Sequence, residues 1–93
     1  MKERFETIDP DGTNRVIELR GRDAWALKEL IQAGSNGCNP MAHPGPRWSA
    51  YVHRLRHHFD LHIETIYEAH GGEFAGVHGV YFLCGDVRRL RND

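Results

Sequence analysis

Prolines crowd the middle of this chain and divide it into two halves. Pro40, Pro44 and Pro46 fall within seven residues, in a stretch from 35 to 46 that also holds two glycines. Proline lacks a backbone N–H and clashes with the preceding helical turn, so no long helix can cross this stretch. At the first position of a helix that N–H is not needed, and Pro46 therefore suits a helix start. The chain must place separate elements on either side of a turn-rich connection.

A helix is predicted before the prolines, over residues 22–33. The carboxylate of Asp23 is placed to cap it, by accepting a hydrogen bond from a free N–H of the first turn. Gly34 stands where a left-handed C-cap is expected. The apolar residues at helical spacing form one stripe: Ala24, Leu27, Leu30 and Ile31.

A second helix is predicted after the prolines, over residues 46–58. Its apolar face carries Trp48, Val52, Leu55 and Phe59, at positions i, i+4, i+7 and i+11. Its opposite side carries Arg47, Tyr51, Arg54 and His58. This reading of the helical period offers Tyr51 and Arg54 outward together.

An N-terminal β-hairpin is predicted over residues 2–20. Residues 5–8 and 15–19 are rich in β-formers, and the sequence Asp-Pro-Asp-Gly at 9–12 stands between them. Proline presets the first angle of a turn, and glycine accepts the positive φ that follows.

A second hairpin is predicted over residues 61–84. Residues 61–67 and 77–84 alternate their apolar side chains, and a glycine-rich loop with Gly71 and Gly72 separates them. Two alternating segments around such a loop are typical of a hairpin with a long tip. The last residues, 86–93, are expected to form a flexible tail.

The order of these elements predicts one α+β domain over residues 1–93. A helix, a turn and a second helix (22–58), followed by a two-stranded hairpin, is the order of a winged helix-turn-helix, with the C-terminal hairpin as the wing. The side chains expected to be mostly buried are Leu27, Leu30, Ile31, Trp48, Val52, Leu55, Ile63 and Phe82.

Several short motifs between Leu19 and Leu83 also resemble a known family. They are Gly21-Arg22, Trp25-Ala26-Leu27, Ala33-Gly34, Gly37-Cys38, Pro46-Arg47-Trp48-Ser49-Ala50-Tyr51-Val52, His53, Leu55-Arg56, Ile63-Glu64-Thr65 and His70-Gly71-Gly72. Together they resemble a group of small bacterial and phage-borne winged-helix domain proteins. The resemblance implies a winged helix and a DNA-binding or regulatory role.

Charge is distributed unevenly along the chain. Twelve basic and thirteen acidic residues give a net charge of -1, yet no Asp or Glu stands between Leu30 and Phe59. This acid-free stretch includes the second predicted helix, which would enter the major groove of double-stranded DNA while the wing tip touches the backbone or minor groove. The residues predicted to contact DNA are Arg47, Ser49, Tyr51, Arg54, His58, His70 and Gly71.

A protein-binding module on the same scaffold is the alternative. Acidic residues near the wing tip, Glu64, Glu68 and Glu73, would oppose phosphate contacts, which supply most non-specific affinity for DNA. Such a module could act as a phage-type inhibitor of a host or defence protein. Both hypotheses leave the oligomeric state open, a homodimer included.

The histidines and cysteines predict no metal site. His53 and His57 lie one helical turn apart, and Cys38 and His43 are the nearest further ligands, but this spacing matches no standard zinc pattern. Cys38 and Cys84 are expected to be reduced, partly buried thiols.

Catalytic motifs do not emerge from the sequence. No serine or cysteine has a matching base and orienting acid, and no phosphate-binding glycine motif surrounds Gly71 and Gly72, so the sequence predicts neither an enzyme nor a cofactor. Residues 1–6 lack the apolar stretch expected of a signal peptide, and no apolar run approaches the ~20 residues that a membrane helix needs. A cytoplasmic protein without membrane contact is expected.

Overall fold

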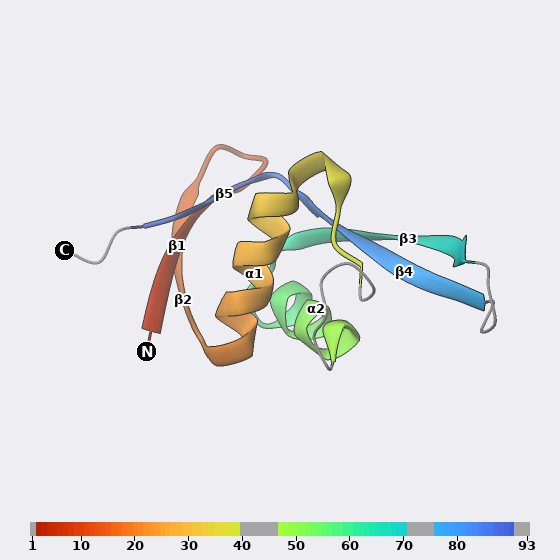
Figure 1. Cartoon of the computed structure of the whole chain (residues 1–93). Coiled ribbons are helices and arrows are strands. Elements are labelled where there is room, and N and C mark those ends of the chain that lie inside the picture. The colour runs from red at the N-terminus through yellow and green to blue at the C-terminus, as the bar shows by residue number, and fades with distance from the viewer. Residues whose placement is uncertain (1, 40–46, 71–75, 91–93) are drawn as a thin grey trace.

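The computed structural model describes residues 2–39, 47–70 and 76–90. Its elements are β1 (Lys2–Ile8), β2 (Asn14–Arg20), α1 (Gly21–Ala33), the 3-10 turn η1 (Gly34–Asn36), α2 (Trp48–His57), β3 (His62–His70), β4 (Gly76–Cys84) and β5 (Asp86–Arg89). Figure 1 shows α1 between the N-terminal strands and α2, while the β3–β4 hairpin extends away from the helices. Apart from η1 and β5, this is the order of elements that the sequence predicts.

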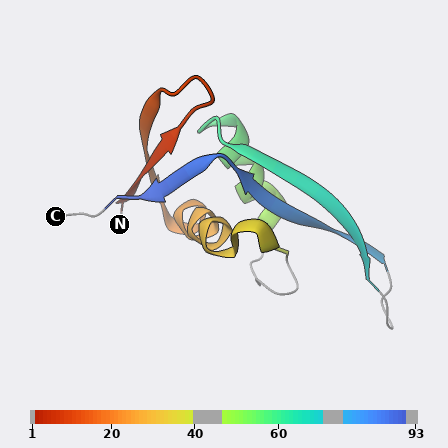
Figure 2. The ribbon, with the colours of Figure 1, turned by 90° about the horizontal axis from the view of Figure 1, so that it is seen from above.

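The strands form two antiparallel sheets. One has the order β2-β1-β5 and the other pairs β3 with β4. Only Gly85 separates β4 from β5, and its φ of 101° is a left-handed value that favours glycine. The chain therefore bends sharply at this point and passes from the wing into the N-terminal sheet (Figure 2).

The flexible tail predicted for residues 86–93 is wrong for its first part. β5 pairs with β1, with Thr7 opposite Val87, and the backbone N–H of Leu90 donates to the carbonyl of Arg4 at 2.8 Å. The partner strand lies some eighty positions earlier in the chain, so no local pattern could indicate this pairing. Residues 91–93 lie outside the described part.

The charges of this C-terminal strand are paired with acids of β1. Arg88 lies 2.7 Å from a Glu6 carboxylate oxygen, and Arg89 lies 2.8 Å from a Glu3 carboxylate oxygen. Arg88 and Arg89 therefore link β5 to β1 through ion pairs and do not belong to a free basic tail.

Both helix starts differ from the sequence prediction. α1 begins at Gly21 with Arg20 as its N-cap, which makes no side-chain cap bond, so the capping role predicted for Asp23 is wrong. Asp23 instead lies within the first turn. α2 begins at Trp48 with Arg47 as its N-cap and ends at His57, and Pro46 lies outside the described residues.

The core lies where the two helices meet both sheets. Of the eight side chains expected there, six are buried: Leu27, Leu30, Trp48, Val52, Leu55 and Ile63. Ile31 and Phe82 are partly exposed. The N-terminal hairpin adds Phe5, Ile17 and Leu19, because the inward side of its sheet covers α1. In the described part of the chain, no helix is long and apolar enough to cross a membrane.

Candidate nucleic-acid interface

Aromatic side chains fix how α2 sits against its neighbours. The rings of Trp25 and Trp48 lie 5.3 Å apart between centroids, and Tyr81 of β4 stacks on Trp48 at 6.0 Å and 18°. Tyr51 meets both indoles edge-on, at 6.3 Å from Trp25 and 6.2 Å from Trp48. One cluster therefore joins α1, α2 and the wing, and it decides which side of α2 remains outside.

The outward position predicted for Tyr51 is wrong, because its side chain is only 4% exposed. Trp48, Tyr51, Val52 and Leu55 stand at i, i+3, i+4 and i+7, which is the full apolar stripe of one helix face. The sequence therefore contained the signal. The predicted stripe passes from Trp48 to Val52 at i+4 and leaves out Tyr51 at i+3, although both positions lie on the same helix face.

Arg54 does not stand free beside Tyr51 as predicted. Its Nε lies 2.9 Å from Oδ1 of Asp23, and its guanidinium NH2 lies 2.7 Å from the same oxygen. This hydrogen bonding to Asp23 raises the pKa of Arg54 above its usual value, so the cation stays charged. The pair links α2 to the first turn of α1, and its charge is already balanced.

The outward face of α2 is instead centred on Ser49, His53 and His57. These three residues are exposed, at i, i+4 and i+8, and the imidazole centroids of His53 and His57 lie 4.5 Å apart. Arg47 is exposed at the N-terminal end of this face and His58 at the other. α2 itself contains no acidic residue. We call these five residues the α2 outer face.

Arg56 holds the wing in a fixed position relative to α2. Its Nε donates to the carbonyl of Ile63 at 2.8 Å, and its NH2 donates to Oγ1 of Thr65 at 2.8 Å. Both acceptors belong to β3, so Arg56 joins the base of the wing to α2.

The wing itself is a long ladder from His62 opposite Cys84 to His70 opposite Gly76. On β3, Tyr67 is 73% exposed and Ile66 is 51% exposed, and Glu64 and Glu68 are exposed beside them. Of the wing-tip residues predicted to touch DNA, His70 ends β3, and Gly71 lies outside the described residues, as does Glu73 of the alternative hypothesis.

The comparison with known families decides where this chain belongs. A family model described as a winged helix domain matches residues 16–93. The chain belongs to the winged helix domain family. The match includes both helices, the wing and β5, and it leaves out β1 and the first two residues of β2. No curated protein and no solved structure matches this winged-helix chain significantly.

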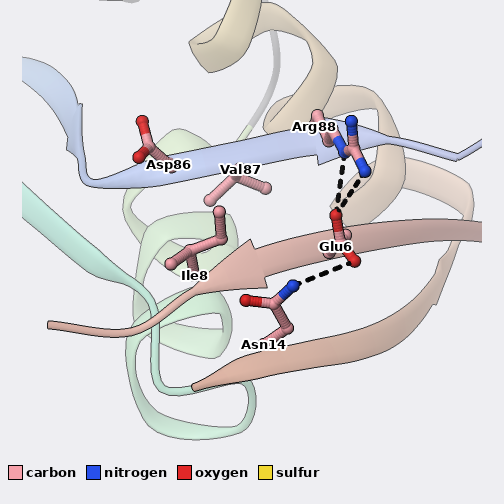
Figure 3. A pocket seen from close by; sticks show the side chains of 6 residues that line it. All are labelled: Glu6, Ile8, Asn14, Asp86, Val87 and Arg88. Atoms are coloured by element: carbon pink, nitrogen blue, oxygen red, sulfur yellow. Dashed lines mark hydrogen bonds and ion pairs between the residues drawn. The ribbon is translucent and has the colours of Figure 1, made fainter. Parts of the chain in front are cut away.

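A pocket of about 380 Å³ lies on the outer side of the N-terminal sheet (Figure 3). Its lining residues are Glu6, Ile8, Asn14, Asp86, Val87 and Arg88. The Glu6 carboxylate accepts hydrogen bonds from Arg88 at 2.8 Å and from Asn14 at 3.5 Å. None of the lining residues is a serine, cysteine or histidine, so this pocket offers no nucleophile with an adjacent base.

The two cysteines of this winged-helix domain are free thiols in different surroundings. Cys38 is fully buried, and its backbone bridges to Tyr81 through two hydrogen bonds of 2.8 Å. Burial, with a smaller effect of the Glu29 charge, raises the pKa of Cys38 to about 11. Cys84 is partly exposed, and its Sγ donates to the Phe82 carbonyl at 3.6 Å.

Alkylation should separate these two thiols. Because only the thiolate attacks iodoacetamide, native protein at pH 8 should be modified at Cys84, while Cys38, with a pKa of about 11, stays unmodified. Peptide mass spectrometry after a timed reaction checks this, with urea-unfolded protein as the control in which both residues react. Equal modification of the two thiols in native protein would contradict the buried position of Cys38.

Proposed function

We propose that this winged-helix domain binds double-stranded DNA, with α2 in the major groove and the wing against the backbone or minor groove. The observation that carries the proposal is the α2 outer face, which is exposed along the whole helix and contains no carboxylate. A major groove admits one helix, and basic or hydrogen-bonding side chains on that helix read the base edges. A transcription regulator or another DNA-associated factor of bacterial or phage origin, acting in the cytoplasm, is the role that fits such binding.

Electrostatics support this orientation. Asp23 is the acid bound directly to α2, and Arg54 neutralises it through a 2.7 Å ion pair. The N-terminal end of α2 carries the positive end of the helix dipole, where backbone N–H groups favour a phosphate. Arg47 stands at that end and is exposed.

The contacts proposed for DNA differ from those expected from sequence alone. His53 and His57 replace Tyr51 and Arg54 in the groove, because they occupy the exposed side of the helix. Arg47, Ser49 and His58 keep the role that the sequence suggested for them, as do His70 and Gly71 at the wing tip.

Replacing Arg47 by alanine should weaken DNA binding by about 1–3 kcal/mol and lower the salt slope of binding by about one unit. Arg47 makes no side-chain cap bond to α2, so the helix should persist in the variant. Gel shifts on random duplex DNA across a salt series measure both quantities. Arg4→Ala is the matched control, since it removes one exposed arginine from the outer side of β1.

Two results would count against this proposal. The first is the absence of any gel shift for the wild type at low salt, where charge-driven binding is strongest. The second is an equal loss of affinity in Arg47→Ala and Arg4→Ala, because that would assign the binding to net charge and not to the α2 outer face.

A protein partner is the second candidate, and the wing supports it. Tyr67 and Ile66 are exposed large apolar side chains on one strand, and Glu64 and Glu68 flank them. Exposed aromatic residues are enriched where proteins contact each other, while the acids would repel phosphate. Two results together would favour a protein partner over DNA. The wild type would give no gel shift, and a protein partner would be retained by the wild type and lost by Tyr67→Ser.

A further inference from the structure

Three metal-ligating side chains of different types meet at the base of the wing. His62 and Glu64 are two residues apart on β3 and therefore point to the same side of the strand. Cys84 of β4 lies directly opposite His62 in the strand register. The ligand atoms of all three side chains lie within 4.8 Å of one another. We infer that these residues form a binding site for a zinc-type divalent cation.

The separation of the ligand atoms fits tetrahedral coordination. With the bond lengths usual for zinc, a ligating nitrogen and a ligating oxygen stand about 3.3–3.5 Å apart, and sulfur stands about 3.5–3.7 Å from either. Nε2 of His62 lies 3.6 Å from Oε1 of Glu64, and both side chains are more than half exposed. Small rotations of these two exposed side chains are enough to complete the geometry around one ion.

The donor set selects the class of cation. A thiolate, an imidazole and a carboxylate suit zinc or cobalt, whereas calcium and magnesium require more oxygen ligands. On binding, the Cys84 thiol releases one proton to solvent, the neutral imidazole of His62 donates its lone pair, and Glu64 binds as carboxylate. The two negative ligands balance the charge of the ion, and a water molecule takes the fourth position.

The surroundings of the site also favour a cation. His62 and Cys84 line a cavity of about 270 Å³ to which Asp60 and Asp86 also contribute carboxylates. These acids make the approach to the site negative and attract cations. Asp9 lines the same cavity, but Arg15 holds it at 2.8 Å.

The site differs from the zinc arrangement that the sequence argument excluded. A closed structural site needs four protein ligands, and here three are supplied by two strands that already pair along nine positions. The fold of the wing therefore does not depend on the ion. The sequence could not indicate this site, because Cys84 joins the other two ligands only through strand pairing.

Cobalt titration of the reduced, tag-free chain tests the site. We expect one cobalt ion per chain and a thiolate-to-cobalt charge-transfer absorption, which zinc abolishes by displacing the cobalt. Cys84→Ser should remove the absorption, and His62→Gln and Glu64→Gln should weaken binding by at least about tenfold. His53→Gln is the matched control, because it removes an exposed histidine of the close His53–His57 pair on α2, which is not part of the proposed site.

Several outcomes would overturn the inference. They are the absence of charge-transfer absorption at saturating cobalt, an absorption that persists in Cys84→Ser, and cobalt binding that is lost in His53→Gln but kept in His62→Gln. Should Cys84→Ser not fold, alkylation of the wild type decides, because zinc must slow the reaction of iodoacetamide with Cys84. An unchanged rate of modification would be a negative result for the site.

Discussion

Replacing Leu55 by alanine should lower the free energy of unfolding by about 2–5 kcal/mol, the range found for well-packed leucines. The Leu55 side chain is fully buried on the apolar stripe of α2, and the backbone carbonyl of Leu55 accepts the N–H of Leu61 at 3.1 Å, where the chain turns toward β3. Truncation of the Leu55 side chain to a methyl group leaves a cavity in the core on the buried side of α2. A chain of this size has a stability of only about 5–15 kcal/mol, so the loss is a large fraction of the total.

Urea titration followed by circular dichroism measures this effect. His53→Ala is the matched control, since it changes an exposed position two residues earlier on the same helix, where we expect a change within about 0.5 kcal/mol. A loss below about 1 kcal/mol for Leu55→Ala would show that the helix packs by another face.

The helices and hairpins could be predicted because each is encoded by local periodicity. Leu27 and Leu30 on one helix, and Val52 and Leu55 on the other, repeat at the helical period and are buried. Apolar alternation similarly indicated the strands that became β3 and β4. Such patterns depend only on residues near each other in the chain, and the structure confirms them with boundaries shifted by a few residues.

Features that depend on distant partners could not be predicted in this way. Asp23 suits an N-cap by sequence, but its true partner is Arg54, thirty-one residues away. Residues 86–89 lack a long apolar pattern and form a strand only because Glu6 and the backbone of β1 provide partners. The metal-ligand cluster arises in the same way, from the register of two strands.

The candidate interface depends both on local periodicity and on contacts between distant residues. The acid-free stretch predicts α2 as the DNA-contacting helix, and this stays a prediction. The choice of its outward side required knowing that Tyr51 belongs to the buried stripe. Tyr51 and Arg54, which the sequence predicts to point outward, and His53 and His57, which are exposed, lie on different sides of the same helix. Sequence therefore identified the helix, and only the packing of Trp25 and Trp48 identified its exposed face.

Replacing Gly37 by alanine should destabilise the domain by at least about 2 kcal/mol, through two separate effects. Gly37 is buried at the end of η1 with φ 73° and ψ 167°, a backbone conformation that residues other than glycine rarely adopt. A Cβ atom here would lie 2.6 Å from Cε1 of Phe82 and 2.9 Å from Cγ1 of Val80. These contacts are shorter than van der Waals distance, so β4 must move away from the residue that precedes Cys38.

Gly34→Ala separates the two effects, because Gly34 also has a positive φ, 54°, but a Cβ atom there meets nothing within 4 Å. Both variants carry backbone strain, and only Gly37→Ala adds overpacking of about 1–3 kcal/mol. The double variant Gly37→Ala with Phe82→Leu removes the ring atoms that the new methyl group meets and should recover part of the difference in urea titrations. Equal losses in the two single variants, or no recovery in the double variant, would mean that β4 does not press on Gly37. The wing would then be held to the helices mainly by Arg56 and by the stacking of Tyr81 on Trp48.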